Sequence, residues 1–394
     1  MEGKNFKKKI LIFSTAYYPF VGGAEVAVKE ITDRLGSSTG EFEFDLITAK
    51  LKKDLPSVEK IGVVNIYRIG AGRPLFDKLF LPFRGAILAK KLHKTNNYSL
   101  LWGIMITFGS GAGYLFNILQ SLTGRKKVPI VLTLQEGDSE SHLQYRWLGL
   151  IALSWRLAFR RTNYLTGISN FLLHRAKKNG YKGPLALVPN GVDLSVFTRG
   201  VNDEDKNELK NRLGKKEGNI FLVTSGRLTH KNAVDDIISA LPSLPNNIFL
   251  LVIGKGERGS YLQKQTRQLK VVDRVKFLGF LPHEQIQKYF SVCDIFVRPS
   301  RSEGFGNSFI EAMASRLPVI ATPVGGIPDF IDDKETGIFC SPDSPQSIVR
   351  AVNLLCGDRV LRDKIVENAV RRVNERYGWA DITAQMKEVF NKIQ

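Results

Sequence analysis

The sequence predicts an α/β fold with two doubly wound, parallel-sheet domains that follow one another along its 394 residues. Short apolar runs rich in β-branched residues alternate with amphipathic segments of helical length, which is typical of parallel strands joined by crossover helices. The alternation restarts near residue 219, and the chain is too long for one ordinary domain. We therefore expect two Rossmann-like domains.

The strands expected from these apolar runs fall into two sets. The first set is KKILIFS, FEFDLIT, VVNIYRI, LLWGIMI, PIVLTL, NYLTGIS and LALVPN, and the second is NIFLVTSG, IFLLVIG, VKFLG, DIFVRPS, PVIAT and GIFC. A charged stretch without aromatic residues, RGVNDEDKNELKNRLGKKEG (199–218), separates them, so the domain boundary is expected within residues 192–218. Doubly wound domains bind ligands at the carboxyl ends of their strands, which predicts a site in a cleft between the domains.

The charge of the chain is uneven. Its net charge is +19, yet residues 1–200 hold 29 Lys/Arg against 14 Asp/Glu while residues 201–394 hold 28 against 24. An anionic partner is therefore expected to bind the first half of the chain. The three cysteines, Cys293, Cys340 and Cys356, have no CxxC spacing, which disfavours a disulfide framework and a cysteine zinc site and favours the reducing cytoplasm.

Two segments imitate membrane signals. The start, KKKILIFSTAYYPF, has a short apolar run and no small-residue cleavage site, so a buried first strand is expected instead of a signal peptide. The uncharged run 100–122 is long enough to span a bilayer, but several glycines interrupt it. We interpret it as a strand (LLWGIMI), a turn (FGSGAG) and a helix (YLFNILQSL), and expect no transmembrane helix.

The stretch EGFGNSFIEAMA (303–314) carries the most informative chemistry. It follows the expected strand DIFVRPS, so Glu303 falls in a strand-to-helix loop, and Asn307 or Ser308 is expected to cap the helix. A helix amino terminus attracts phosphate, and the loop glycines allow a close approach. Glu311, about one turn into the helix, points back toward the same place. Carboxylates that accept hydroxyl hydrogen bonds beside a phosphate site suit a sugar nucleotide; the structural alternative is a solvated Glu311 beside a simple glycine turn.

Around this motif stand LVPNGVDLSVF, FLVTSGRLTHKNAVDDIISA, FLLVIGKGE, VKFLGFLPHEQIQKYFSVCDIFVRPS and PVIATPVGGIPDFI. With the paired glutamates they resemble, nearly end to end, the retaining family-four glycosyltransferases of the GT-B fold. The resemblance implies a donor site with Glu311 at the ribose, Glu303 and the backbone of Phe305, Gly306 and Asn307 at the sugar, and Gly226, Arg227 and a following lysine at the diphosphate. It also implies an N-terminal acceptor-side domain (1–192), a C-terminal nucleotide-sugar domain (193–377), and a last helix (about 378–394) that returns to the first domain.

A cation near the diphosphate has a physical reason that is independent of the resemblance. The donor leaves as a nucleoside diphosphate, and preorganised cations stabilise the charge that develops on the departing oxygen. Arg227 follows the strand NIFLVTSG and can grip phosphate with two hydrogen bonds. The chain departs from the family at the lysine, because Asn232 stands where the family pattern has it. We predict that Lys231 acts in its place; the alternative is a solvated lysine at a helix start, and the neighbouring His230 is expected to be incidental.

The first domain carries a second glycine loop, Gly22-Gly23 in STAYYPFVGGAEVAV, which resembles the family's amino-terminal loop facing the diphosphate and the acceptor. It lacks the three spaced glycines of a dinucleotide fingerprint, so redox chemistry is disfavoured. Glu25 is predicted on the acceptor side, although a glutamate favoured by the helix dipole explains it equally well. In LQEGDSESH, Gln135 lies where many relatives have a histidine and can hydrogen-bond a sugar without exchanging a proton. The nearby Glu136 and Asp138 are further candidates, and His142 is expected to be structural.

No metal ion and no cofactor are expected, with the nucleoside-diphosphate sugar as substrate. The acidic run Asp203-Glu204-Asp205 imitates a cation-binding carboxylate pair, but it falls in the charged interdomain stretch and is interpreted as solvated. The resemblance implies that the sugar is transferred on the face from which the diphosphate leaves, with a phosphate oxygen helping to take the acceptor's proton.

The basic first domain is expected to meet an anionic membrane surface. Segments 84–94 and 145–162 interleave cations with Trp, Leu and Phe at helical spacing; the alternative is that the apolar residues belong to the core. No nucleic-acid signature is present.

The sequence thus predicts a retaining, metal-independent hexosyltransferase of polysaccharide or glycolipid biosynthesis. It would move a sugar from a nucleoside diphosphate to a glycan, lipid-linked or small-molecule acceptor, in the cytoplasm at the inner face of the membrane. A noncatalytic sugar- or membrane-binding module stays open because of Asn232 and Gln135. A GT-B sugar-nucleotide epimerase is disfavoured because its catalytic carboxylates and histidines have no counterparts in the strand-end loops.

Overall fold

A computed structural model describes residues 7–38, 40–137 and 150–393. The chain divides into two compact units, unit 1 with residues 1–190 and 379–394, and unit 2 with residues 191–378. The predicted division was at residues 192/193 and 377/378. The charged stretch 199–218 lies within unit 2, where most of it forms helix α8 (Asp203–Leu213).

Unit 1 is built on an eight-stranded sheet with the order β3-β4-β2-β1-β5-β6-β7-β8. Its strands are β1 (Lys8–Phe13), β2 (Phe42–Ala49), β3 (Val58–Ile61), β4 (Val64–Ile69), β5 (Leu100–Ile104), β6 (Ile130–Leu134), β7 (Tyr164–Gly167) and β8 (Leu185–Leu187). All pairs are parallel except β3 with β4. The edge strand β3 is not among the predicted strands, because it is short and partly exposed and lacks an apolar run.

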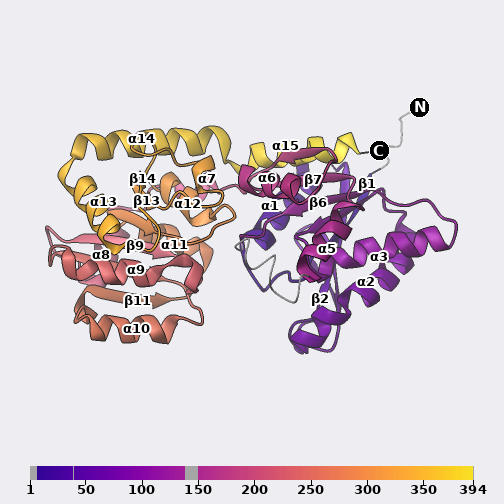
Figure 1. The fold of residues 1–394 in the computed structure, drawn as a ribbon, viewed down its shortest axis with the longest axis horizontal. Helices are drawn as coiled ribbons and strands as arrows, with labels where there is room; N and C mark the ends of the chain where they lie inside the picture. Colours follow the sequence, from indigo (N-terminus) through magenta and orange to yellow (C-terminus); the bar gives the residue numbers. More distant parts are fainter. Residues whose placement is uncertain (1–6, 39, 138–149, 394) are drawn as a thin grey trace. The chain divides into compact units, whose positions relative to one another are not determined.

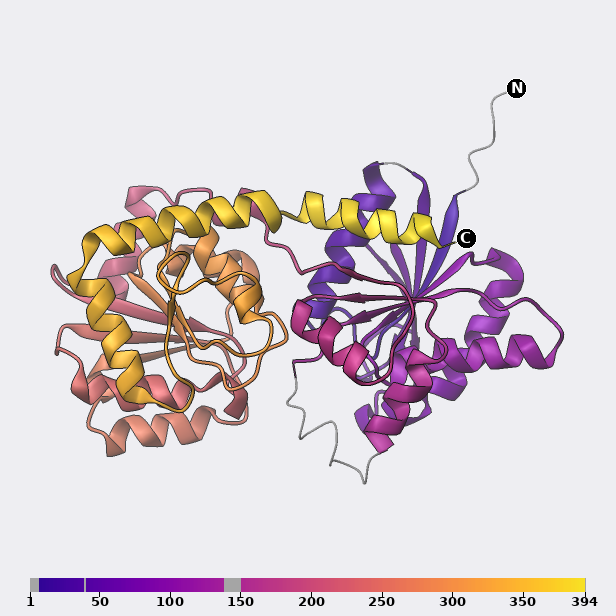
Figure 2. The same ribbon diagram turned by 45° about the horizontal axis from the view of Figure 1, so that its top comes forward.

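Both faces of this sheet are buried, which explains the uninterrupted apolar strands. The helices of unit 1 are α1 (Gly23–Ser38), α2 (Pro74–Asn96), α3 (Phe108–Leu122), α5 (Leu150–Phe159), α6 (Asn170–Lys178) and α15 (Trp379–Lys392). In β1, Ile10 and Ile12 pack with α1 and α15, while Leu11 and Phe13 pack with α2 and α3. The two helix layers can be followed in Figure 2.

The last helix, α15, is therefore part of the core of unit 1. It lies against α1 (Figure 1). Its Phe390 ring packs on Trp102 and Phe42, with centroids 5.2 and 6.0 Å away. Trp379, the first residue of α15, is also buried.

The uncharged run 100–122 forms β5 and α3, and the interpretation of FGSGAG as a turn is wrong, since α3 begins at Phe108. The glycines there serve close packing on β1. A Cβ at Gly109 would lie 2.5 Å from the carbonyl carbon of Ser14, and one at Gly113 would lie 3.2 Å from the Phe13 ring. None of the helices in the described ranges is both long and apolar enough to span a bilayer.

The two segments expected to face a membrane differ. In 145–162, residues 145–149 lie outside the described residues, and Trp155 and Phe159 of α5 are buried, so the expected membrane face is wrong for these two rings. In 84–94, part of α2, Ile87 is exposed, but Leu88 and Leu92 pack against the core. The other exposed large apolar side chains of α2 precede the predicted segment: Leu75, Phe76, Leu79, Phe80 and Phe83. The same helix carries the cations Lys78, Arg84, Lys90, Lys91 and Lys94.

Unit 2 has a six-stranded sheet with the order β11-β10-β9-β12-β13-β14, and every strand pair in it is parallel. Its strands are β9 (Ile220–Ser225), β10 (Ile248–Ile253), β11 (Val275–Gly279), β12 (Ile295–Arg298), β13 (Val319–Ala321) and β14 (Ile338–Phe339). Besides α8, its helices are α7 (Leu194–Phe197), α9 (Val234–Ala240), α10 (Gly259–Gln268), α11 (His283–Phe290), α12 (Asn307–Ala314), α13 (Pro345–Gly357) and α14 (Arg359–Arg376) (Figure 1).

The two faces of this sheet are packed differently. On one face, aliphatic residues of α9, α10 and α13 meet the strands. On the other, Phe296 of β12 contacts the rings of Phe290 in α11 and Phe309 in α12, at 5.7 and 5.6 Å. The prediction of two Rossmann-like parallel-sheet domains is confirmed.

Candidate active site

Most of the predicted donor-site residues lie on two loops at the centre of the unit 2 sheet. Strands β9 and β12 are direct neighbours, with Leu222 beside Ile295. The chain then proceeds from β9 outward to β10 and β11, and from β12 in the opposite direction to β13 and β14. This is a topological switch point, where loops separate at the carboxyl ends of the strands and leave room for a ligand. The loops that follow β9 and β12 both begin there.

The loop after β9 is held close to its neighbour by glycines. Gly226 has φ +147°, and a Cβ at Gly254, after β10, would lie 1.9 Å from the Gly226 carbonyl oxygen. The next residue, Arg227, is exposed, and its guanidinium makes no hydrogen bond or ion pair with any residue in the described ranges. Lys231 is half-buried in the short 3₁₀ turn His230–Asn232. A cation is thus presented directly at the strand end.

Asn232, which stands at the family's lysine position, is 4% exposed. Its Nδ2 donates to the Arg227 carbonyl oxygen at 2.5 Å. Its Oδ1 accepts a hydrogen bond from Arg298 Nη2 at 2.9 Å. The Asn232 side chain is therefore buried and stabilises the loop that carries Arg227.

The loop after β12 fixes Glu303, which is 8% exposed. Its Oε1 accepts from the Gly304 N–H at 3.1 Å, and its Oε2 pairs with Arg298 Nη2 at 2.5 Å. Its carbonyl oxygen accepts from the Gly326 N–H at 3.2 Å. A Cβ at Gly325, where φ is +59°, would lie 1.8 Å from that oxygen. The glycine pair of PVGGIPDF therefore clamps the backbone of Glu303.

Arg298, the last residue of β12, was not among the predicted site residues, although it is 92% buried and lies between the two loops. In addition to its hydrogen bonds with Asn232 and Glu303, Arg298 donates from Nη1 to Ser308 Oγ at 2.7 Å. Its guanidinium lies 5.4 Å from the centre of the Phe309 ring. A buried charge needs such partners. The signal in the sequence was a lone arginine inside an apolar strand, DIFVRPS.

Helix α12 begins at Asn307, and the expected side-chain cap is wrong. The capping position is Gly306, with φ +95° and no side-chain hydrogen bond, because the Ser308 hydroxyl is engaged by Arg298. Glu311 is 7% exposed, and its Oε1 lies 2.9 Å from Nε2 of His283, the first residue of α11. The ring of Phe305 is buried against Phe330 and Tyr377, so only its backbone remains for a ligand.

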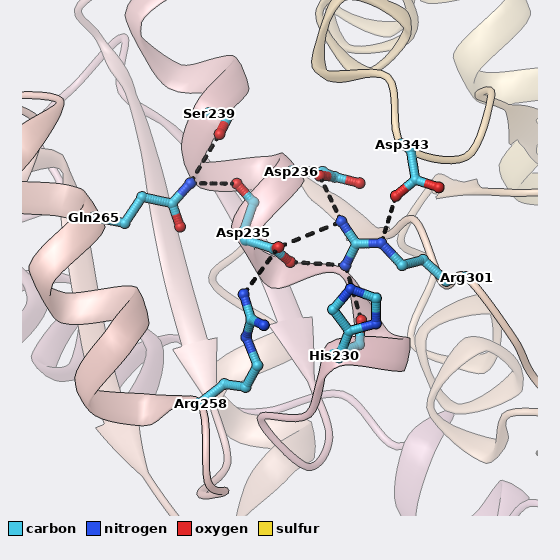
Figure 3. A network of polar contacts seen from close by, with 8 residues as sticks. All are labelled: His230, Asp235, Asp236, Ser239, Arg258, Gln265, Arg301 and Asp343. Carbon is cyan, nitrogen blue, oxygen red and sulfur yellow. Dashed lines mark hydrogen bonds and ion pairs between the residues drawn. The ribbon is translucent and has the colours of Figure 1, made fainter.

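Arg301 ties the two loops together (Figure 3). The backbone N–H of Arg301 donates to the Lys231 carbonyl oxygen at 2.7 Å. Its side-chain Nη1 donates to the His230 carbonyl oxygen at 2.8 Å. The guanidinium also pairs with Asp235 and Asp236 in the first turn of α9, each at 2.9 Å (Figure 3). Sequence reasoning missed this residue. It anchors the backbone of the turn that carries Lys231.

The predicted residues of unit 1 lie at the corresponding edge of their own sheet. Gly22 and Gly23 stand at the start of α1, and a Cβ at Gly22 would lie 2.8 Å from Glu25 Oε2, so the Glu25 side chain folds back over the loop. Gln135 follows β6, and its Oε1 accepts from Asn190 Nδ2 at 3.3 Å. Asp138 and His142 lie outside the described residues.

The hollow in unit 1 lined by Lys126, Lys127, Arg160 and Arg161 lies at the opposite edge, where β5, β6 and β7 begin. Ligand sites of doubly wound sheets form at the carboxyl ends, so this hollow is not the counterpart of the unit 2 site. The acidic run 203–205 forms the first turn of α8 behind the capping Asn202, a position that the helix dipole favours for carboxylates.

Comparisons with known proteins match the chain to glycosyltransferases. The family Glycosyltransferase Family 4 matches residues 21–196, and the family Glycosyl transferases group 1 matches residues 205–372. An uncharacterized glycosyltransferase of Methanocaldococcus jannaschii, MJ1607, is 26% identical over 97% of both chains.

Solved structures resemble the whole fold. Sucrose-phosphate synthase from Thermosynechococcus elongatus superposes with a TM-score of 0.82 at 21% identity, over 98% of this chain and 99% of that one. HepE of Anabaena, solved with UDP and glucose, gives 0.77 at 21% identity, over 98% of this chain and 100% of that one.

The Arg301 network predicts a pH-dependent contribution to stability. Burial raises the pKa of the Asp236 carboxyl to about 6, against the opposing effect of Arg301. The folded state therefore binds this proton more tightly than the unfolded chain, so the stabilisation is complete below about pH 4 and is lost as pH rises through 6. Relative to Asp236→Asn, the free energy of unfolding of the wild type should fall by up to about 3 kcal/mol between the low-pH and the high-pH end of that range.

Urea unfolding of both proteins between pH 4 and 7.5 measures this difference. A wild-type-minus-variant difference that stays constant with pH would contradict the assignment of a raised pKa to Asp236.

Proposed function

This chain belongs to the group 1 glycosyltransferases with the GT-B fold, and we propose that it transfers a sugar, with retention, from a nucleoside diphosphate to a glycan or lipid-linked acceptor. The observation that carries the proposal is that Arg227 follows β9, and that Glu303 and Glu311 follow β12, the two neighbouring strands at the switch point of the unit 2 sheet. A cation beside two buried carboxylates suits a molecule with an anionic middle and hydroxyls on both sides.

The diphosphate is proposed to lie between the loop after β9 and the start of α12. Arg227 is exposed at this strand end, Lys231 is carried on the same loop, and no side chain caps α12, so its amino terminus is left for an anion. These groups stabilise the charge that grows on the departing oxygen. Because HepE was solved with UDP and glucose, uridine diphosphate sugars are the first donors to test.

The carboxylates are proposed to hold the two sugars of the donor. Glu311 accepts hydrogen bonds from the ribose hydroxyls, which requires that the ribose share or replace the His283 contact. Glu303, already oriented by the Gly304 N–H and Arg298, accepts from the transferred sugar, next to the backbone of Phe305, Gly306 and Asn307. A carboxylate fixed before binding loses little entropy when the sugar arrives.

The reaction is proposed to proceed without a metal ion. The bond from the anomeric carbon to the diphosphate oxygen breaks, the acceptor oxygen bonds to the same face of that carbon, and a diphosphate oxygen takes the acceptor's proton. Glu25 and Gln135 are assigned to the acceptor side, and Gly22 and Gly23 to the donor, at the loop that faces both the diphosphate and the acceptor. The charge of the leaving group is met by Arg227, Lys231 and α12, and activity should persist in a chelator.

An acceptor in a membrane is favoured by the exposed face of α2. Phe83 and Ile87 are 62% and 66% exposed, which is unusual for large apolar side chains at neighbouring turns of a helix. Arg84 and Lys91 accompany them, and such a combination of apolar and basic residues suits the interface of an anionic bilayer. We therefore assign the enzyme to the inner face of the cell membrane as a peripheral protein.

The donor site is tested by release of free nucleoside diphosphate from UDP-, GDP- and ADP-sugars. Arg227→Ala should lower kcat by about a hundredfold or more, because it removes stabilisation of the leaving group. Glu311→Ala should mainly raise KM, by roughly tenfold to a hundredfold, because it removes a charge-assisted hydrogen bond made already in the ground state.

Arg267→Ala, at an exposed position on α10, is the matched control and should behave as wild type. Equal and negligible effects of the two site variants would overturn the site. No turnover together with no thermal shift by any nucleotide would favour a noncatalytic module.

Membrane docking is tested by co-sedimentation with vesicles of neutral and of anionic lipid. Phe83→Ser should weaken binding to anionic vesicles by roughly tenfold or more, since burying one phenyl ring contributes about 2 kcal/mol. Phe280→Ser in unit 2, where the ring is 64% exposed, should leave binding unchanged. Binding that ignores both lipid charge and Phe83 would contradict the proposed role of α2.

A further inference from the structure

One position in the donor site departs from what the family resemblance leads one to expect, and the side chain beside it carries a charge. Position 232, where the resemblance places a lysine, holds a buried asparagine. The side chain it contacts, at 2.9 Å, is a buried arginine, Arg298, that comes from the next strand of the sheet. A neutral residue thus stands where a cation was expected, and a cation lies immediately beside it.

The two side chains are electrostatically matched. A lysine at position 232 would bring an ammonium group against the Arg298 guanidinium, which like-charge repulsion disfavours inside a protein. An asparagine instead offers its carbonyl oxygen to the guanidinium and its N–H to the Arg227 carbonyl oxygen. The amide therefore makes room for one buried cation and links it to the loop of Arg227.

Arg298 also lies close to the loop that carries Arg227. It lines a closely packed space, too small for a water molecule, together with Gly226, Arg227 and Asn232, and a Cβ on Gly226 would lie 3.4 Å from its Nη1. Its Nε finds no hydrogen-bond partner among the described residues. Its Nη2 holds Glu303, the carboxylate proposed for the transferred sugar.

We propose that Arg298 is a positioning residue that supplies, from the end of β12, the buried positive charge that the family pattern places at position 232. In this role it orients Glu303, braces the Arg227 loop through Asn232 and adds its charge to the field at the donor diphosphate. The inference rests on the proposed function of the site.

A double-mutant cycle that moves the positive charge from position 298 to position 232 tests the inference in the full chain. The variants are Arg298→Gln, Asn232→Lys and the double variant with both changes, with Arg298→Lys as the conservative substitution and Lys231→Ala for comparison. The readouts are the affinity for the nucleoside diphosphate that binds wild type best among UDP, GDP and ADP, kcat for its release from the donor sugar, and the melting temperature.

Arg298→Gln should lower kcat at least a hundredfold, because it leaves Glu303 without its cation, and Asn232→Lys should lower kcat by placing two cations together. The double variant should regain at least tenfold over Arg298→Gln, since a lysine at 232 then occupies the space of the guanidinium. Arg298→Lys should retain more activity than Arg298→Gln, and Lys231→Ala should lower kcat less than Arg298→Gln does.

A double variant no more active than Arg298→Gln, with melting temperatures near wild type, would overturn the inference. If Arg298→Gln does not fold, Arg298→Lys and the double variant are compared with wild type instead. Loss of nucleotide affinity in both of these variants would overturn the inference. If wild type itself binds no nucleoside diphosphate, the proposed function fails and the inference fails with it. Binding by wild type without rescue in the cycle refutes the inference alone.

Discussion

The need to pair one buried guanidinium governs the centre of unit 2. Arg298 is 8% exposed, and a charge at such a place is tolerated only with oriented partners. Those partners come from the 3₁₀ turn after β9, the loop after β12 and the first turn of α12, as Asn232, Glu303 and Ser308. Each belongs to a segment that the proposed chemistry needs. Satisfying the charge therefore also sets the geometry of the site before any ligand arrives.

Much of this was predictable from the sequence. Apolar runs buried on both faces of a sheet identify parallel strands directly, and the glycines beside Glu303 marked the strand-to-helix loop. The missed features depend on tertiary context. The glycines of FGSGAG proved to serve close packing of α3 on β1, and β3 lacks an apolar run. The cap predicted at Asn307 or Ser308 failed because both residues lie inside α12, which begins behind Gly306, and Ser308 Oγ instead accepts a hydrogen bond from Arg298. Periodicity also does not tell which apolar side of α2 faces the core and which faces solvent.

The proposed function assigns different roles to the two units, and their surfaces differ accordingly. Unit 2 carries the proposed nucleotide site, where an exposed cation and a helix amino terminus lie at one switch point with two buried carboxylates. Unit 1 carries most of the excess positive charge of the chain, and its exposed apolar residues concentrate on α2. In unit 1 the paired Gln135 and Asn190 offer amide groups, which can hydrogen-bond a sugar without exchanging protons. This suits a transfer in which the leaving diphosphate accepts the proton.

A crystal structure of the full chain with the nucleoside diphosphate that it binds would test the central claim most directly. The account predicts phosphate oxygens within hydrogen-bonding distance of the Arg227 guanidinium and the first N–H groups of α12. It also predicts ribose hydroxyls on Glu311 and an unchanged pair between Arg298 and Glu303. A diphosphate held instead in the basic hollow of unit 1, by Lys126, Lys127, Arg160 and Arg161, would contradict it.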